Sequence, residues 1–144
     1  MKKPFNPDKF MIDAASADLR PFVGCPQLST MRQLSRGEEK VFFITKMVEL
    51  AALIHSMPKV YEQDGLGDKA VAYLHYFTGQ CDWYITEKDS EPEQLQAFGY
   101  ANLGDDQNAE LGYISIVELM ENGVELDLHF TPRTLAEIKQ RKAA

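Results

Sequence analysis

The sequence VAYLHYFTGQCDWYITE, residues 71–87, predicts a β-hairpin near the middle of this 144-residue chain. Its first half is rich in the apolar and aromatic residues that favour strands. Gly79 and Gln80 can form a two-residue type II′ turn, which places glycine at the first central position. A turn at this point fixes the pairing of the two strands and sets His75 opposite Tyr84.

Alternation of side chains along the two strands gives the hairpin two faces of different character. The apolar face is expected to pack on the core, with a largely buried Trp83; it carries Ala72, Leu74, Tyr76, Trp83 and Ile85. The mixed face carries Tyr73, His75, Phe77, Asp82, Tyr84 and Thr86. A bare aromatic face of this size is unusual in a soluble monomer, so a covering helix is favoured. An open face would instead offer Tyr73, His75 and Tyr84 for binding.

The strongest helix pattern covers residues 36–56, where Ser35 and Glu38 fit a capping box and Pro58 ends the helix. This helix is apolar on most of its circumference, and it is the expected cover for the mixed face. A shorter helix is predicted over residues 7–15. Pro21, Gly24 and Pro26 interrupt residues 16–33, which are predicted to form a loop.

Two more strands and two short helices are predicted after the hairpin. The strands cover residues 96–103 and 125–130, a short helix follows the Ser115 cap, and Thr131 with Pro132 begins the last helix. The predicted class is α+β, with an antiparallel sheet of about four strands built on the central hairpin and packed with helices.

The length favours a single domain, residues 1–144, in which a helical extension (1–67) precedes an α+β core (68–144). No apolar run approaches the roughly 20 residues that span a bilayer, so no membrane association is expected. Cys25 and Cys81 fit no metal spacing, and reduced thiols are typical of a cytoplasmic protein. The composition predicts no cofactor and leaves the oligomeric state open.

Negative charge is concentrated in the second half of the chain. Residues 79–127 contain twelve acidic residues and one basic residue, Lys88. Such a region repels phosphate backbones, so direct nucleic-acid binding is not expected. A basic protein partner, or a site that normally holds nucleic acid, is electrostatically allowed, although acidic loops also keep proteins soluble. The candidate binding surface consists of Asp89, Glu91, Glu93, Asp105, Asp106 and Glu110.

Several short motifs lie in a fixed order along the second half of the chain: WYITE (83–87), AFG (97–99), ELGYIS (110–115), EL (118–119), a strand (125–130) and TL (134–135). With them, residues 69–138 resemble a family of small uncharacterised proteins, a domain of unknown function encoded largely on plasmids, phages and other mobile elements. The resemblance implies a compact α+β domain and a mobile-element context. It implies no activity and transfers no catalytic residues. The stretch before Lys69 looks like an addition to the usual short form.

Three pairs of residues are candidates for chemical sites. In the first pair, Asp127 and His129 lie on one face of a predicted strand and could bind a metal together with His75 or Asp82. Solvated edge-strand residues give the same pattern, so no metal site is assigned.

Glu87 with Glu110 could act as a general acid–base pair, and Cys81 with His75 as nucleophile and base. A cleft for the first of these pairs and an orienting third residue for the second are not identifiable, so no catalytic residue is assigned. The residues therefore favour a non-enzymatic, acidic protein-interaction module, and the family resemblance implies that it belongs to a mobile element and acts on a host-defence or replication component. The alternative is a metal-assisted hydrolase that uses Asp127 and His129.

Overall fold

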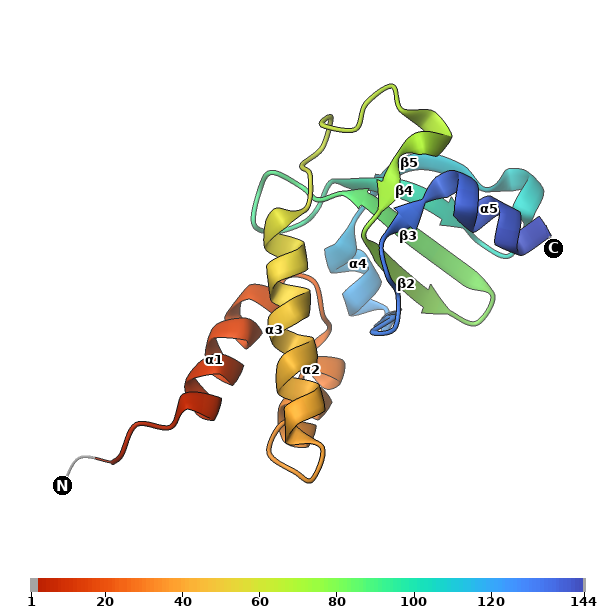
Figure 1. Ribbon diagram of the computed structural model, residues 1–144. Helices are drawn as coiled ribbons and strands as arrows, with labels where there is room; N and C mark the ends of the chain where they lie inside the picture. Colours follow the sequence, from red (N-terminus) through yellow and green to blue (C-terminus); the bar gives the residue numbers. More distant parts are fainter. Residues whose placement is uncertain (1–2, 144) are drawn as a thin grey trace.

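The computed structural model describes residues 3–143 and has the predicted α+β class (Figure 1). Its α-helices are α1 (Pro7–Leu19), α2 (Cys25–Leu34), α3 (Lys40–Ser56), α4 (Ile116–Glu121) and α5 (Leu135–Ala143). Its strands are β1 (Val71–Ala72), β2 (Leu74–Thr78), β3 (Cys81–Glu87), β4 (Ala97–Asn102), β5 (Glu110–Ile114), β6 (Glu125–Leu126) and β7 (Arg133–Thr134).

Five strands form one antiparallel sheet in the order β5-β4-β3-β2-β6, and β1 pairs separately with β7. The hairpin prediction is confirmed, because His75 pairs with Tyr84 and Thr78 pairs with Cys81 across the two-residue turn. Gly79 has a φ of 54°, the positive value that a type II′ turn requires at this position. The hairpin therefore provides the central strand of the sheet, β3, and its neighbour β2.

The apolar face of the hairpin lies in a large cluster that we call the first core. Leu74, Tyr76 and Ile85 pack there with buried side chains from α1, α2, α3 and α4. Tyr76 is fully buried, and its hydroxyl donates a hydrogen bond to the carbonyl oxygen of Phe22, 2.5 Å away. The first core thus joins the N-terminal helices to the sheet.

The expectation that the helix of residues 36–56 covers the mixed face is wrong. Helix α3 packs mainly on α1 and α2, and its buried residues belong to the first core. The mixed face is covered by α5 instead, in a second core made of Ala70, Ala72, Tyr84, Tyr100, Leu135 and Ile138. An apolar helix can bury its surface against other helices as well as against a sheet. The composition of α3 therefore did not determine which face of the sheet it packs against.

The face assignment of two hairpin residues is also corrected. The chain breaks its strand at Tyr73, between β1 and β2, and alternation does not continue across the break. Ala72 therefore lies in the second core, and Tyr73 packs against the first. Trp83 packs against the first core but is only half-buried, not largely buried as expected.

Helix boundaries differ from the prediction in the N-terminal part. Only residues 20–24 of the predicted loop 16–33 lie outside a helix, because α1 continues to Leu19 and Pro26 lies in the first turn of α2, where proline favours a helix start. Ser35 does not cap α3; its hydroxyl donates to the carbonyl oxygen of Met31 at the end of α2. Helix α3 consequently starts at Lys40.

The predicted strand 125–130 is shorter than expected. After β6, the Asp127 carboxylate accepts the backbone N–H of His129 at 2.9 Å, which closes a turn. The last helix starts later than Thr131 because Thr134 caps it, with its hydroxyl accepting the backbone N–H of Glu137. Within residues 3–143, no helix combines the length and the apolar character needed to cross a membrane.

Candidate functional site

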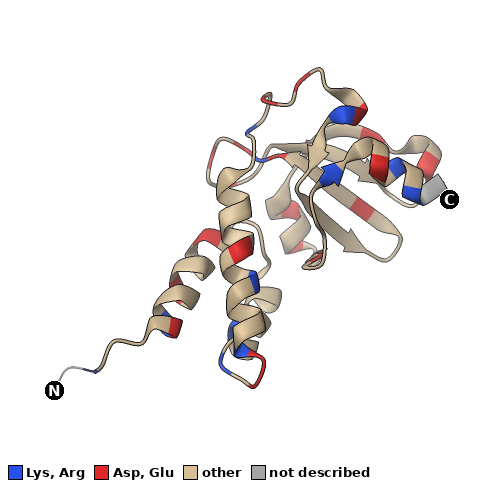
Figure 2. Cartoon of the chain, in the orientation of Figure 1, with Lys and Arg blue, Asp and Glu red and all other residues tan. Residues whose placement is uncertain are grey.

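Five of the six acidic candidate residues occupy two loops at opposite ends of β4, and the sixth, Glu110, begins β5. Residues 88–96 lead into this strand and residues 103–109 leave it. Strand β5 pairs antiparallel with β4, so Ile114 lies at the end near the first loop and Glu110 at the end near the second. Figure 2 shows acidic positions distributed over several elements. The two loops do not form one patch, but they flank the same strand, β5.

Some of these carboxylates hold their own loops in shape. Asp89 accepts the backbone N–H groups of Glu91 and Gln96, at 3.1 Å each. Asp105 accepts the backbone N–H of Gln107, and Asp106 accepts the side-chain amide of Asn102. Glu91, Glu93 and Glu110 are exposed, as are Asp105 and Asp106, but within residues 3–143 the three glutamate carboxylates hold no loop in this way. They are therefore the acidic residues most available to a partner.

Strand β5 is one of the two edges of the sheet, and it is the open one. Leu111 is 41% exposed and Tyr113 is 56% exposed. The opposite edge, β6, has only two residues, and the Gln27 side chain bonds both the N–H and the carbonyl oxygen of Leu126. Edge strands are templates for pairing with another chain unless they are short or covered. Of the two edges, β6 is protected and β5 is available.

Tyr61 extends the exposed surface beside β5. Its hydroxyl lies 2.5 Å from the hydroxyl of Tyr113, and the ring of Tyr113 meets Phe98 edge-on at 5.7 Å. Tyr61 itself is 69% exposed. The three rings come from the connection after α3, from β4 and from β5. This group was not predicted from the sequence, because the segment before the hairpin has the composition of a flexible linker.

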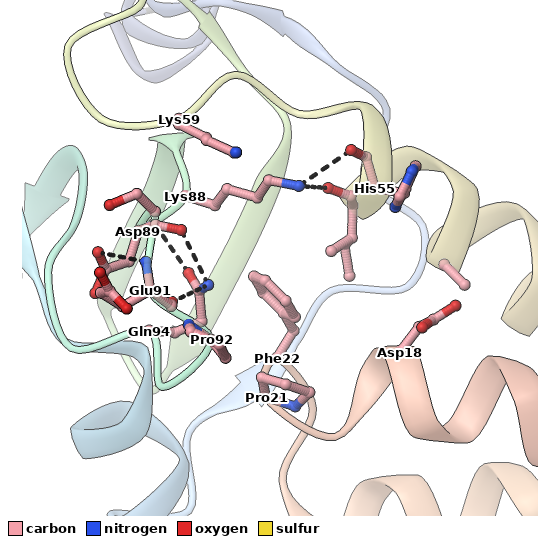
Figure 3. A pocket seen from close by; sticks show the side chains of 13 residues that line it. Asp18, Pro21, Phe22, His55, Lys59, Lys88, Asp89, Glu91, Pro92 and Gln94 are labelled. Carbon is pink, nitrogen blue, oxygen red and sulfur yellow. Dashed lines mark hydrogen bonds between the residues drawn. The ribbon is translucent and has the colours of Figure 1, made fainter.

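A pocket of about 240 Å³ lies where the helices meet the loop of residues 88–96 (Figure 3). Lys88, the single base of the acidic region, extends into it and donates to the carbonyl oxygens of Ile54 and His55, at 2.7 and 3.1 Å. Burial, and then the nearby charge of Lys59, lower the pKa of Lys88. A lysine at the last carbonyls of a helix stabilises its negative end, so Lys88 joins α3 to the sheet.

The three candidate residues of the mixed hairpin face do not lie on one open surface. Tyr73 packs against the first core, and Tyr84 is buried in the second. His75 stacks on Tyr84, with ring centroids 4.5 Å apart. Burial, and then the charges of Asp82 and Asp127, raise the pKa of Tyr84 to about 12.

His75 lies between two carboxylates. Its Nε2 is 2.7 Å from Asp82 and its Nδ1 is 3.0 Å from Asp127. Although partial burial raises the pKa of Asp127, hydrogen bonds from His75 and from the backbone of His129 lower it more, and the net shift is downward. The cluster joins the turn after β6 to the hairpin.

The other chemical candidates are separated or already bonded. Glu87 is buried and accepts the backbone N–H groups of Tyr61 and Gln63, whereas Glu110 is exposed at the start of β5. Glu87 pairs with Phe98 and Glu110 pairs with Ala101, so the two carboxylates lie on non-adjacent strands and about 10 Å apart along them. Among residues 3–143, no three His, Cys, Asp or Glu side chains are arranged to hold a metal ion.

Comparison with known proteins gives one match. A family model described as a protein of unknown function (DUF2958) matches residues 44–140, about two-thirds of the chain. The match begins within α3, earlier than residue 69. No curated protein and no solved structure matches the chain.

Proposed function

We propose that this chain, which belongs to the DUF2958 family of proteins of unknown function, is a protein-binding module that adds an extended segment of a partner to strand β5. The observation that carries the proposal is the difference between the two sheet edges. β5 has five residues and exposed Leu111 and Tyr113, while β6 is short and held by Gln27. In strand addition, main-chain hydrogen bonds supply affinity and side-chain contacts supply specificity.

The charges beside β5 indicate what kind of segment it would take. Glu91 and Glu93 project from the loop near one end of β5, and Glu110 lies at the other end. A segment with basic residues would be attracted along this edge, and its association rate would fall as salt screens the field. A nucleic-acid backbone would be repelled.

The biological setting that fits this proposal is the mobile-element context implied by the family resemblance. The partner would then be a cytoplasmic host-defence or replication protein with a basic extended segment. The metal-assisted hydrolase has no comparable support, because Asp127 is bonded to His75 and closes the turn after β6.

A selection with random linear peptides displayed on phage tests the proposal even while the partner is unidentified. The full chain is the bait, and the dissociation constant of an enriched peptide is measured by titration. We expect Leu111→Asn to weaken binding roughly fivefold to thirtyfold, because it removes an exposed apolar contact of the edge.

Val41→Asn is the matched control, since Val41 is 73% exposed on α3, away from the sheet edge. It should bind the peptide as the parent does. Replacing Glu91, Glu93 and Glu110 together by Gln should weaken binding at low salt and remove most of its salt dependence. Equal affinity of the parent and Leu111→Asn would exclude β5 as the binding edge.

A further inference from the structure

A small pocket lies beside the β5 edge, between the connection after α3 and the sheet. Its volume is about 130 Å³, well below the roughly 300 Å³ or more of typical small-molecule sites. It is therefore suited to one side chain. The lining residues that set its chemical character are Tyr61, Asp64, Glu87, Phe98 and Leu111. Leu111 belongs to β5, so the pocket adjoins the edge to which a partner strand would be added.

We propose that this pocket receives one cationic side chain, Lys or Arg, of the partner segment docked on β5; the inference rests on the proposed function. The aromatic rings of Tyr61 and Phe98 can bind the cation or its aliphatic stem. Asp64 and Glu87 supply negative charge, and no Lys or Arg among residues 3–143 lines the pocket. An aromatic and acidic lining of this kind selects a cation over an apolar side chain of similar length.

Glu87 gives the pocket a fixed carboxylate. It is 3% exposed, and its two oxygens accept the backbone N–H groups of Tyr61 and Gln63 at 2.6 and 3.2 Å. A carboxylate has about four lone-pair sites, so these two bonds leave acceptor capacity for a further donor. The same bonds hold the segment that carries Tyr61 against the sheet.

The backbone at Tyr61 is a second, independent observation. Its φ is 80°, in the left-handed region that is unfavourable for a bulky residue. The other non-glycine residue described with positive φ, Gln94, is buried, and its side-chain amide bonds the backbone of Asp89 and Glu91. Tyr61 is exposed, and glycine would suit its backbone better. Residues with strained backbone cluster at ligand-binding and switch regions of proteins.

Tyr113 connects the pocket to the edge strand. Its hydroxyl is within hydrogen-bonding distance of the Tyr61 hydroxyl, and its ring contacts Phe98. The hydrogen bond with Tyr61, and then burial and the charges of Tyr61, Asp64 and Glu87, raise the pKa of Tyr113. These two contacts join the lining of the pocket to the exposed face of β5.

The test uses the peptide selected on the full chain and variants of that peptide in which each Lys or Arg is replaced by norleucine, which has a similar length but no charge. One replacement should weaken binding about threefold to thirtyfold, the range of a cation held by an aromatic ring. Tyr61→Gly should weaken binding of the unmodified peptide by a similar factor. It should also raise the urea midpoint of unfolding, because it relieves the backbone strain at this position. Asp64→Asn should also weaken binding of the peptide.

Asp68→Asn is the matched control. Asp68 is exposed four residues further on, is paired with Lys139 and does not line the pocket. The affinity of the Asp68→Asn variant for the peptide should match that of the parent protein. One outcome is that Leu111→Asn weakens peptide binding while Tyr61→Gly and every norleucine replacement leave the affinity unchanged. In that case β5 binds the peptide and the pocket proposal is wrong. If Leu111→Asn has no effect, the proposed function itself fails.

Discussion

Gly99→Ala is expected to destabilise the fold by about 3 kcal/mol or more, or to prevent folding. A Cβ atom at Gly99 would lie 2.0 Å from the carbonyl oxygen of Tyr84 and 3.0 Å from the Cα of Ile85. Both atoms are backbone atoms of β3, so no side chain can rotate away. The contact lies beside a register shift between Ile85 and Glu87, where β3 approaches β4 closely. The two strands would have to separate at the centre of the sheet.

Gly112→Ala is the control for this prediction, because Gly112 is the direct partner of Gly99 on β5. A Cβ atom there would meet nothing within 4 Å. We therefore expect Gly112→Ala to change the free energy of unfolding by less than about 1 kcal/mol. Urea denaturation of the three proteins measures both effects. Equal stability of the Gly99 and Gly112 variants would show that the close approach of β3 and β4 is not as described.

Asp127→Asn is expected to lower the free energy of unfolding by about 1–3 kcal/mol near neutral pH, because it removes the charge from a hydrogen bond with the His75 ring. The folded-state pKa of Asp127 is lowered, so its contribution is present above the unfolded value of about 4 and is lost as the pH falls through the folded value. The difference between parent and variant should therefore narrow below about pH 4.

Glu125→Gln is the matched control, since Glu125 is an exposed carboxylate in β6, two residues before Asp127. Its substitution should have little effect at any pH. Urea titrations from about pH 3 to pH 8 provide the measurement. A difference between parent and Asp127→Asn that is as large near pH 3 as at neutral pH would contradict an ionised, bonded Asp127.

The hairpin could be predicted from the sequence because its information is local. The Gly79 turn and the alternation of the strands fix the pairing, and the structure has that pairing. The α4 cap could be predicted for the same reason, since Ser115 accepts the backbone N–H of Glu118 three residues later. The acidic composition of residues 79–127 could also be predicted from the sequence. The positions of these acidic residues relative to one another could not.

The positions of the helices and the open edge depend on long-range packing, which residue patterns do not specify. Helix α3 is apolar enough to fit either face of the sheet, and only its packing on α1 and α2 places it in the first core. Residues 110–114 give no sign in the sequence that β5 is an edge strand of the sheet. Nor could the positive φ of Tyr61 be inferred, because a left-handed backbone at a bulky residue has no local signal in the sequence.

Amide hydrogen exchange with and without the selected peptide tests strand addition at β5 most directly. An added strand would bond the outward N–H groups of β5, so we expect slower exchange at alternate amides of residues 110–114 in the complex. The hollow of about 660 Å³ between α2 and α4 is the natural comparison, and exchange there should not change. Protection confined to that hollow, with β5 exchanging as it does in the free protein, would contradict strand addition at this edge.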